Sequence, residues 1–217
     1  MLRPFSAIFA AIRWRVKVAI TCKAAQNPML AKLAAALITL LLCVRPGAVW
    51  GEPSLRPELW RAALNAEATH KSEIHNSQVL AVIDYSLPSN TRRLFLIDRV
   101  SDTVSAFLVA HGRGSDPDKT GRATRFSDEP QSKMSSLGAF VTGDPYNGAH
   151  GLSLILNGLD AGNRHARLRA IVIHGAPYVR GDLPILGRSW GCPAVEPAKI
   201  DEIINALKGG ALLYIGR

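Results

Sequence analysis

Cysteine is scarce in this 217-residue sequence, which contains only Cys22, Cys43 and Cys192. The sequence also lacks the closely spaced pairs, Cys-x-x-Cys or His-x-x-x-His, that are typical of zinc sites. Its apolar run at 33–44 falls short of the roughly 20 residues that a membrane-spanning helix needs. These absences argue against a disulfide scaffold, a zinc enzyme and a membrane-spanning protein.

Acidic residues are absent from the first 51 residues, which carry seven of the 26 basic side chains. A basic segment, a short apolar core at 33–44 and small residues near Gly51 are typical of a secretory signal peptide. We therefore expect residues 1–51 to direct export to the periplasm and to be removed, with Met29 as an alternative start.

Two further kinds of leader are less favoured. An uncleaved membrane anchor is the first. A lipoprotein attached through Cys43 is the second, and it is disfavoured because Leu42 stands where a small residue is required.

Removal of the leader changes the charge balance. Residues 52–217 retain 19 basic and 17 acidic side chains, and this small excess does not predict a nucleic-acid partner. They also retain Cys192 as the single cysteine, which has no partner for an intramolecular disulfide.

The remaining pattern predicts an α+β domain that is mainly β. A helix is expected at 57–76, where Pro57 suits the first helical position, and another at 197–208. Short β-branched segments predict strands at 79–87, 94–100, 104–109, 138–142, 152–156, 170–174 and 211–215. We expect 52–78 to be a helical extension and 79–217 to be a catalytic domain.

Two segments favour nucleophilic chemistry. His174-Gly175 ends a predicted strand, and Cys192 lies in the Gly-rich turn 187–194. A thiol becomes a nucleophile when a nearby histidine takes its proton. The N–H groups of Gly191 and Cys192 are candidates for an oxyanion hole. A buried core histidine and an inert buried cysteine are the competing interpretation.

The same segments resemble the murein L,D-transpeptidase catalytic-domain family. His174-Gly175 followed by Ser189-x-Gly191-Cys192 looks like the family signature. An ordered set of further blocks resembles one branch: 109–112, 126–127, 135–140, 148–154, 158–159 and Gly-Arg-Ser-x-Gly-Cys-Pro-Ala at 187–194. The resemblance covers about residues 79–217. It implies a β-sandwich or barrel with a helix near each end, and a Gly175 carbonyl that orients His174.

The sequence departs from the better-known branch at two places. Trp190 stands where that branch has a histidine, and 193–195 lacks the arginine that contacts a substrate carboxylate there. Arg188 or a basic residue of the 111–125 loop (Arg113, Lys119, Arg122 or Arg125) could replace that arginine, although exposed solubilising charge is the favoured interpretation for most of these four loop residues. Candidate substrate-binding residues are Arg188, Ser189, Trp190, His111 and Ser136, whereas His150 is interpreted as structural.

By this resemblance, the expected activity is transfer of a peptidoglycan stem peptide from Cys192 to an acceptor amine. The products are 3–3 or 1–3 cross-links, and the thiol is expected to be sensitive to carbapenems. L,D-carboxypeptidase activity on the same substrates is a second possible function. A metal hydrolase using His111, His150, His174 and Cys192 is a third, and a non-catalytic wall-binding module is a fourth. We expect a monomer that uses no cofactor or metal.

Overall fold

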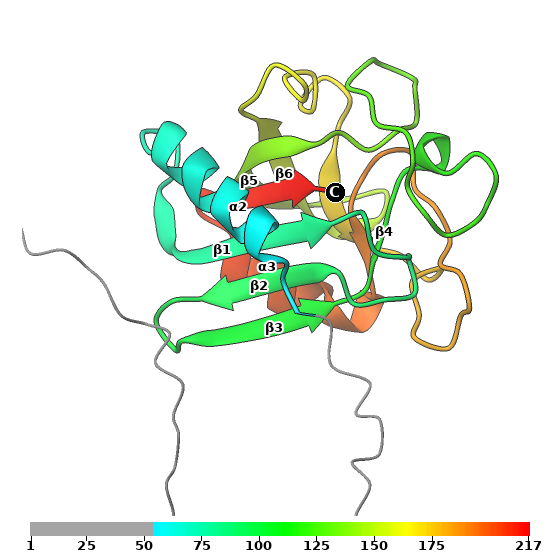
Figure 1. Ribbon diagram of the computed structural model, residues 1–217, viewed down its shortest axis with the longest axis horizontal. Coiled ribbons are helices and arrows are strands. Elements are labelled where there is room, and N and C mark those ends of the chain that lie inside the picture. Colours follow the sequence, from blue (N-terminus) through cyan, green and yellow to red (C-terminus); the bar gives the residue numbers. More distant parts are fainter. Residues whose placement is uncertain (1–53) are drawn as a thin grey trace, which may run out of the picture. The chain divides into compact units, whose positions relative to one another are not determined.

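The computed structural model describes residues 54–217 (Figure 1), so the predicted signal peptide lies outside the described residues. Within 54–217, no helix is long and apolar enough to cross a membrane. The helices are α2 (Pro57–Thr69) and α3 (Ile200–Leu207). The strands are β1 (Asn76–Asp84), β2 (Leu94–Asp98), β3 (Thr103–Phe107), β4 (Val109–Ala110), β5 (Gly138–Gly148), β6 (Gly151–Gly158), β7 (Val172–Gly175), β8 (Ala194–Val195) and β9 (Ala211–Gly216).

All the described strands belong to one nine-stranded sheet with the order β3-β2-β1-β9-β5-β6-β7-β8-β4. β9 lies between β1 and β5, pairing parallel to the first and antiparallel to the second. β7 and β8 also pair in parallel, and the remaining neighbouring strands are antiparallel. The predicted mainly β fold with a helix at each end of the described region is therefore confirmed.

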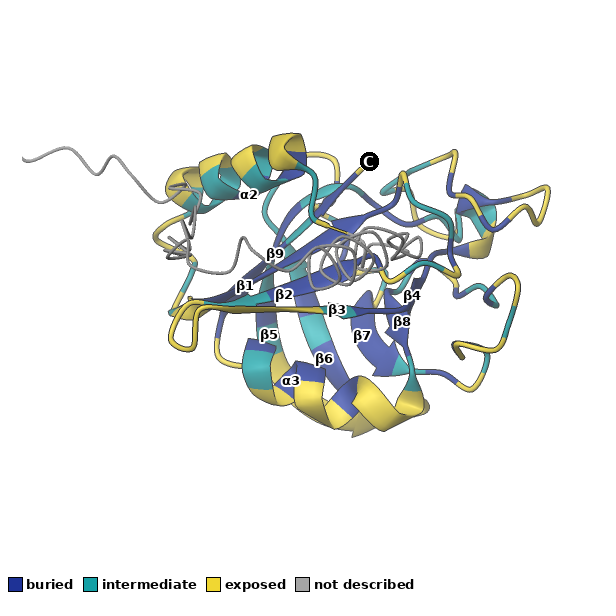
Figure 2. Cartoon of the chain, turned by 60° about the horizontal axis from the view of Figure 1, so that its bottom comes forward, coloured by how far each residue is buried: buried dark blue, intermediate teal, exposed yellow. Residues whose placement is uncertain are grey.

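The two helices cover opposite faces of this sheet (Figure 2). Successive strand residues point to opposite faces. In β1, Ala81 and Ile83 join the core around α3, whereas Leu80 and Val82 join the core around α2. Each fully buried aliphatic side chain stabilises the fold by about 1.5–3 kcal/mol. Both faces of the central strands are therefore apolar, which explains why residues 79–83 of β1 form an unbroken apolar run.

Helix α2 is attached to the sheet by an ion pair as well as by packing. Asp84, at the end of β1, is fully buried and accepts hydrogen bonds from Arg56 Nε at 2.7 Å and Nη2 at 3.1 Å. Leu59 and Ala63 of α2 pack on the sheet below. The segment predicted as an extension thus packs directly against the strands.

Several bounds differ from the prediction. α2 ends at Thr69 instead of residue 76, because the polar stretch 70–73 forms a turn and β1 begins at Asn76. A 3-10 turn at Pro197–Lys199 precedes α3. The two-residue strands β4 and β8 were not predicted, since so short a segment has no readable periodicity.

Candidate active site

His174 and Cys192 are brought together by the parallel pairing of β7 with β8. His174 is paired with Ala194, which lies two residues after Cys192. Cys192 itself lies in the turn just before β8, and the His174 N–H donates to the carbonyl of the adjoining Pro193 at 3.4 Å. Both side chains line one open hollow of about 440 Å³, which we call the thiol hollow.

The His174 ring is held in one tautomer by its neighbour. Nδ1 lies 3.0 Å from the Gly175 carbonyl oxygen, which can only accept, so Nδ1 carries the proton and Nε2 is left as an acceptor. Burial lowers the pKa of His174, the Gly175 hydrogen bond opposes this, and His150 lowers it further. The resulting neutral imidazole can take a proton at neutral pH.

The exposed His150 stacks on His174, with ring centroids 4.4 Å apart and an interplanar angle of 22°. It reaches this position from the turn between β5 and β6, and it also lines the thiol hollow. His150, predicted to be structural, therefore contacts the candidate base directly.

The Cys192 thiol is partly exposed and lies 3.7 Å from the Ala170 carbonyl oxygen. Burial raises the pKa of Cys192, while the Val172 amide and the Arg169 charge lower it. The net direction is upward, so the free protein holds a protonated thiol near neutral pH. Attack by sulfur then requires a base at the moment of reaction.

The turn before Cys192 is fixed by the Ser189 hydroxyl. Ser189 Oγ donates to the Cys192 carbonyl oxygen at 2.6 Å and accepts from the Gly191 N–H at 3.0 Å. Gly191 has φ +129°, and a Cβ there would lie 2.8 Å from the Met134 carbonyl oxygen. Glycine is therefore required at 191 by both its conformation and its surroundings.

This geometry corrects two predicted roles. The Gly191 N–H already has an acceptor in Ser189, so it is not free to bind an oxyanion, and only the Cys192 N–H remains of the predicted pair. Ser189 lines the thiol hollow, but its hydroxyl is already hydrogen-bonded within the turn, to the Cys192 carbonyl and the Gly191 N–H.

Residues that are distant in the sequence hold this turn in place by hydrogen bonds. Ser189 is hydrogen-bonded to the backbone on either side of Gly112. Ser135 Oγ accepts from the Gly112 N–H at 3.0 Å and donates to the Gly191 carbonyl at 3.2 Å. A Cβ on Gly112 would lie 2.9 Å from Gly191 Cα, so these backbones touch. One hydroxyl thus connects three segments beside Cys192.

His111 was predicted to contact substrate, and this is wrong because its side chain is 0% exposed. Nδ1 accepts a hydrogen bond from Nη2 of the buried Arg93 at 2.8 Å, and Nε2 lies 3.6 Å from Asp116. Burial, and then the Arg93 charge, lower the pKa of His111 to about 4. His111 is a neutral core residue behind the site.

Ser136 was also predicted to bind substrate, but it is buried and its hydroxyl is hydrogen-bonded to Arg169. Ser136 Oγ accepts from Arg169 Nη1 at 2.7 Å and donates to the Ser127 carbonyl at 3.1 Å. It does not line the thiol hollow.

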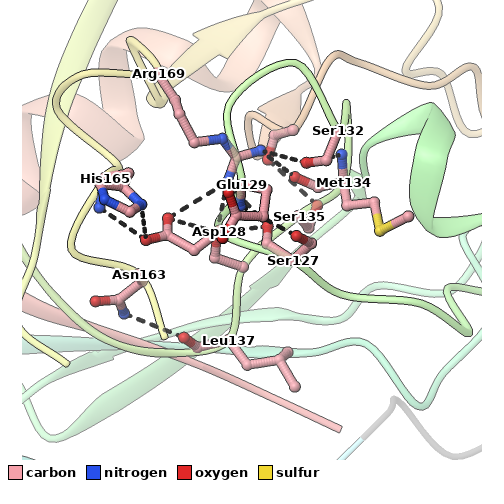
Figure 3. Close-up of polar contacts among 12 residues, drawn as sticks. Ser127, Asp128, Glu129, Ser132, Met134, Ser135, Leu137, Asn163, His165 and Arg169 are labelled. Carbon is pink, nitrogen blue, oxygen red and sulfur yellow. Dashed lines mark hydrogen bonds and ion pairs between the residues drawn. The ribbon is translucent and has the colours of Figure 1, made fainter. Parts of the chain in front are cut away.

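Arg169 is the residue that sequence reasoning missed. Its side chain is 4% exposed, and it donates to the Ser127 and Met134 carbonyls and lies 3.5 Å from Asp128 (Figure 3). It nevertheless lines the thiol hollow and acts electrostatically on Cys192. Its partners lie in the loop before β5, and no motif in the sequence signals this contact.

Of the five basic residues predicted to replace the missing arginine, one lines the thiol hollow and four do not. Arg188 lines the thiol hollow and donates to the Asp116 carbonyl, and Trp190 lines it as an exposed wall. The Arg113 guanidinium lies 5.7 Å from the centre of the Trp190 ring. Residues of the 116–125 loop, which include Lys119, Arg122 and Arg125, do not line the hollow.

Two tyrosines that were not predicted complete the thiol hollow. They are Tyr146 of β5 and Tyr178 in the loop after β7, and burial raises the pKa of Tyr178 to about 12. Among residues 54–217, no three His, Cys, Asp or Glu side chains are grouped so that they could hold a metal ion.

Comparison with known proteins gives remote structural likenesses and one family match. No curated protein matches the chain. Similar solved structures include L,D-transpeptidases from Mycobacterium smegmatis (12% identity, 64% of this chain and 59% of that chain, TM-score 0.41) and Mycobacterium tuberculosis (11%, 64% and 58%, 0.43). Another comes from Xylanimonas cellulosilytica (17%, 65% and 61%, 0.36). The chain thus spans less than two thirds of the length of these proteins.

The family match does not depend on these remote likenesses. The model that describes the L,D-transpeptidase catalytic domain matches residues 51–215, which include α2 and all of the sheet except its last residue, Gly216. The chain therefore belongs to the L,D-transpeptidase catalytic domain family.

Proposed function

We propose that this protein is a peptidoglycan L,D-transpeptidase that uses Cys192 as the nucleophile and His174 as the base. The observation that carries the proposal is the thiol hollow, which is lined by both a neutral His174 and the single cysteine of residues 52–217. The hydrogen bond from His174 Nδ1–H to Gly175 leaves Nε2 available for the thiol proton.

The proposed reaction has two halves. His174 takes the Cys192 proton as sulfur attacks the carbonyl at the L-centre of diaminopimelate in a donor stem. The C–N bond then breaks, and terminal D-Ala leaves with the proton from His174. An amine of a second stem attacks the thioester, gives its proton to His174 and displaces the sulfur, which is reprotonated. The Cys192 N–H is the candidate oxyanion donor.

Mutation of the pair tests the proposal. Incubation with purified muropeptides and mass analysis should show cross-linked products with the unmutated protein and none with Cys192→Ala. His174→Gln should lower the rate by roughly 100-fold or more, because general base catalysis contributes about that much. His75→Gln, at an exposed position outside the hollow, is the matched control. Undiminished cross-linking by Cys192→Ala would eliminate the cysteine mechanism.

Hydrolysis is the second possible fate of the same thioester. If water replaces the acceptor amine, the protein is an L,D-carboxypeptidase that removes D-Ala. The thiol hollow is open to solvent at the partly exposed Cys192, which supports some hydrolysis. The ratio of amine product to water product measures the balance.

Location and inhibition complete the proposal. We place the protein in the periplasm on the pattern of residues 1–51, and fractionation of cells that express the full chain tests this placement. We also expect a carbapenem to acylate Cys192, which intact-protein mass measurement would detect as an adduct absent from Cys192→Ala.

A further inference from the structure

A second hollow, of about 650 Å³, adjoins the thiol hollow at Trp190. Its volume lies within the roughly 300–1,000 Å³ that is typical of ligand pockets. We call it the Trp190 groove, and it is lined by Pro130, Gln131, Lys133, Leu168, Arg169 and Trp190. Arg169 and Trp190 line both hollows, so an occupant of the groove lies beside the site of the thiol chemistry.

The groove combines exposed apolar surface with positive charge. Trp190 is 68% exposed and Leu168 is 74% exposed, and both line this one groove, so their apolar surfaces are gathered at a single place. Lys133 Nζ lies 4.8 Å from the centre of the Trp190 ring. The charged lining residues, Lys133 and Arg169, are both cations. Such a surface fits an anionic ligand with some apolar contact area.

The wall of the groove is held in an unusual backbone conformation. Gln131 has φ +64° and Lys133 has φ +56°, a region that non-glycine residues rarely adopt. Arg169 holds the adjoining segment by donating to the Met134 carbonyl (Figure 3). Strained backbone persists where the surroundings impose it, and it is concentrated at ligand-binding sites.

We infer that the Trp190 groove binds the acyl acceptor, an anionic peptide with a free primary amine. This inference rests on the proposed function. The donor must lie in the thiol hollow, because its carbonyl is bonded to Cys192 in the thioester. The acceptor must reach that same carbonyl while the donor remains attached. The groove provides a separate approach that shares only the Trp190–Arg169 wall with the donor.

Charge reversal in the groove tests this inference. The purified protein is given a donor muropeptide and an amine-bearing acceptor muropeptide, and the ratio of amine product to water product is measured. Lys133→Glu and Leu168→Glu should each lower this ratio by about tenfold, equivalent to roughly 1.4 kcal/mol of lost acceptor binding. Both changes lie at positions with solvent access, so the fold should persist.

Matched controls exist for both substitutions. Lys119→Glu reverses the charge of another lysine with φ +56° outside the groove, and Val100→Glu changes another apolar residue that is 73% exposed. Both controls should keep the ratio of the unmutated protein. Intact-protein mass measurement of the thioester reports the donor step separately.

The outcomes are distinct. A ratio that falls in the two groove variants and not in the controls supports the inference. An unchanged ratio in the groove variants overturns it, and so does a loss of thioester formation with the ratio unchanged, because the groove would then serve the donor. Failure of the unmutated protein to form any thioester would overturn the proposed function itself.

Discussion

At the scale of single residues, burial acts on Cys192 and His174 in opposite directions. It raises the pKa of the thiol and lowers the pKa of the imidazole, so both groups are uncharged near neutral pH. A thiolate–imidazolium pair would require the reverse order of the two pKa values. The proton should therefore move from sulfur to His174 during attack, and not before it.

The pH dependence of acylation tests this order. The acylation rate should fall as pH drops through the pKa of His174, which lies below about 6.5, because protonated imidazole cannot accept the thiol proton. Alkylation of Cys192 by iodoacetamide should keep rising above pH ~8.5, since the thiol pKa is raised. A plateau of alkylation below pH 7 would instead reveal a preformed thiolate.

The charge of Arg169 should also influence the pKa of the Cys192 thiol. Its charge lowers the pKa of Cys192, so Arg169→Met should shift the alkylation midpoint to higher pH, whereas Arg169→Lys should preserve it. Both variants lose hydrogen bonds to the Ser127 and Met134 carbonyls and should be destabilised by about 1.5–3 kcal/mol. Equal midpoints in the two variants would show that Arg169 acts only on stability.

At the scale of helices and strands, the sequence predicted the elements that depend on local patterns and missed those that depend on contacts between distant residues. Helix α3 and strands such as β6 have periodicity that can be read locally, and both were predicted. β4 is formed by pairing with β8, in which Val109 meets Val195 and Ala110 meets Ala194, and β8 pairs on its other side with β7. The bracing of Gly191 by Ser135 and the burial of His111 have the same origin. Local patterns therefore predicted the reacting pair and missed its support.

The Arg56–Asp84 contact should be a principal attachment of α2. Arg56→Ala leaves a fully buried carboxylate whose remaining side-chain partner is Ser86, so the free energy of unfolding should fall by about 1–3 kcal/mol. Urea unfolding measures this change. Arg61→Ala, an exposed substitution on the same helix, is the control and should have little effect. Equal stability of both variants would mean that apolar packing alone holds α2.

At the scale of the whole molecule, the core contains a histidine that must stay neutral. The pKa of His111 is about 4 in the folded protein and near 6.5 when unfolded, so the unfolded chain binds the extra proton between these values. Stability should be fully present above pH ~6.5 and fall as pH drops toward 4, by up to about 3 kcal/mol from this group. The lowered pKa of His174 acts in the same direction.

Unfolding measured across that pH range separates the contributions. His111→Gln keeps an acceptor for Arg93 and should flatten the dependence of unfolding free energy on pH, even if the variant is less stable throughout. His75→Gln, which changes an exposed side chain, should leave the dependence as it is. The assignment to His111 fails if its variant shows the full slope.

The central position of β9 has a consequence for how the molecule is made. In the described sheet, β9 (Ala211–Gly216) is the strand that pairs with both β1 and β5. The two halves of the sheet therefore cannot be joined until these residues, which come late in the sequence, have been synthesised. Pairing across so long a separation slows folding. A chain cut short before Ala211 would present two bare apolar edges, which are templates for aggregation. Formation of the thiol hollow thus depends on a strand that does not line it.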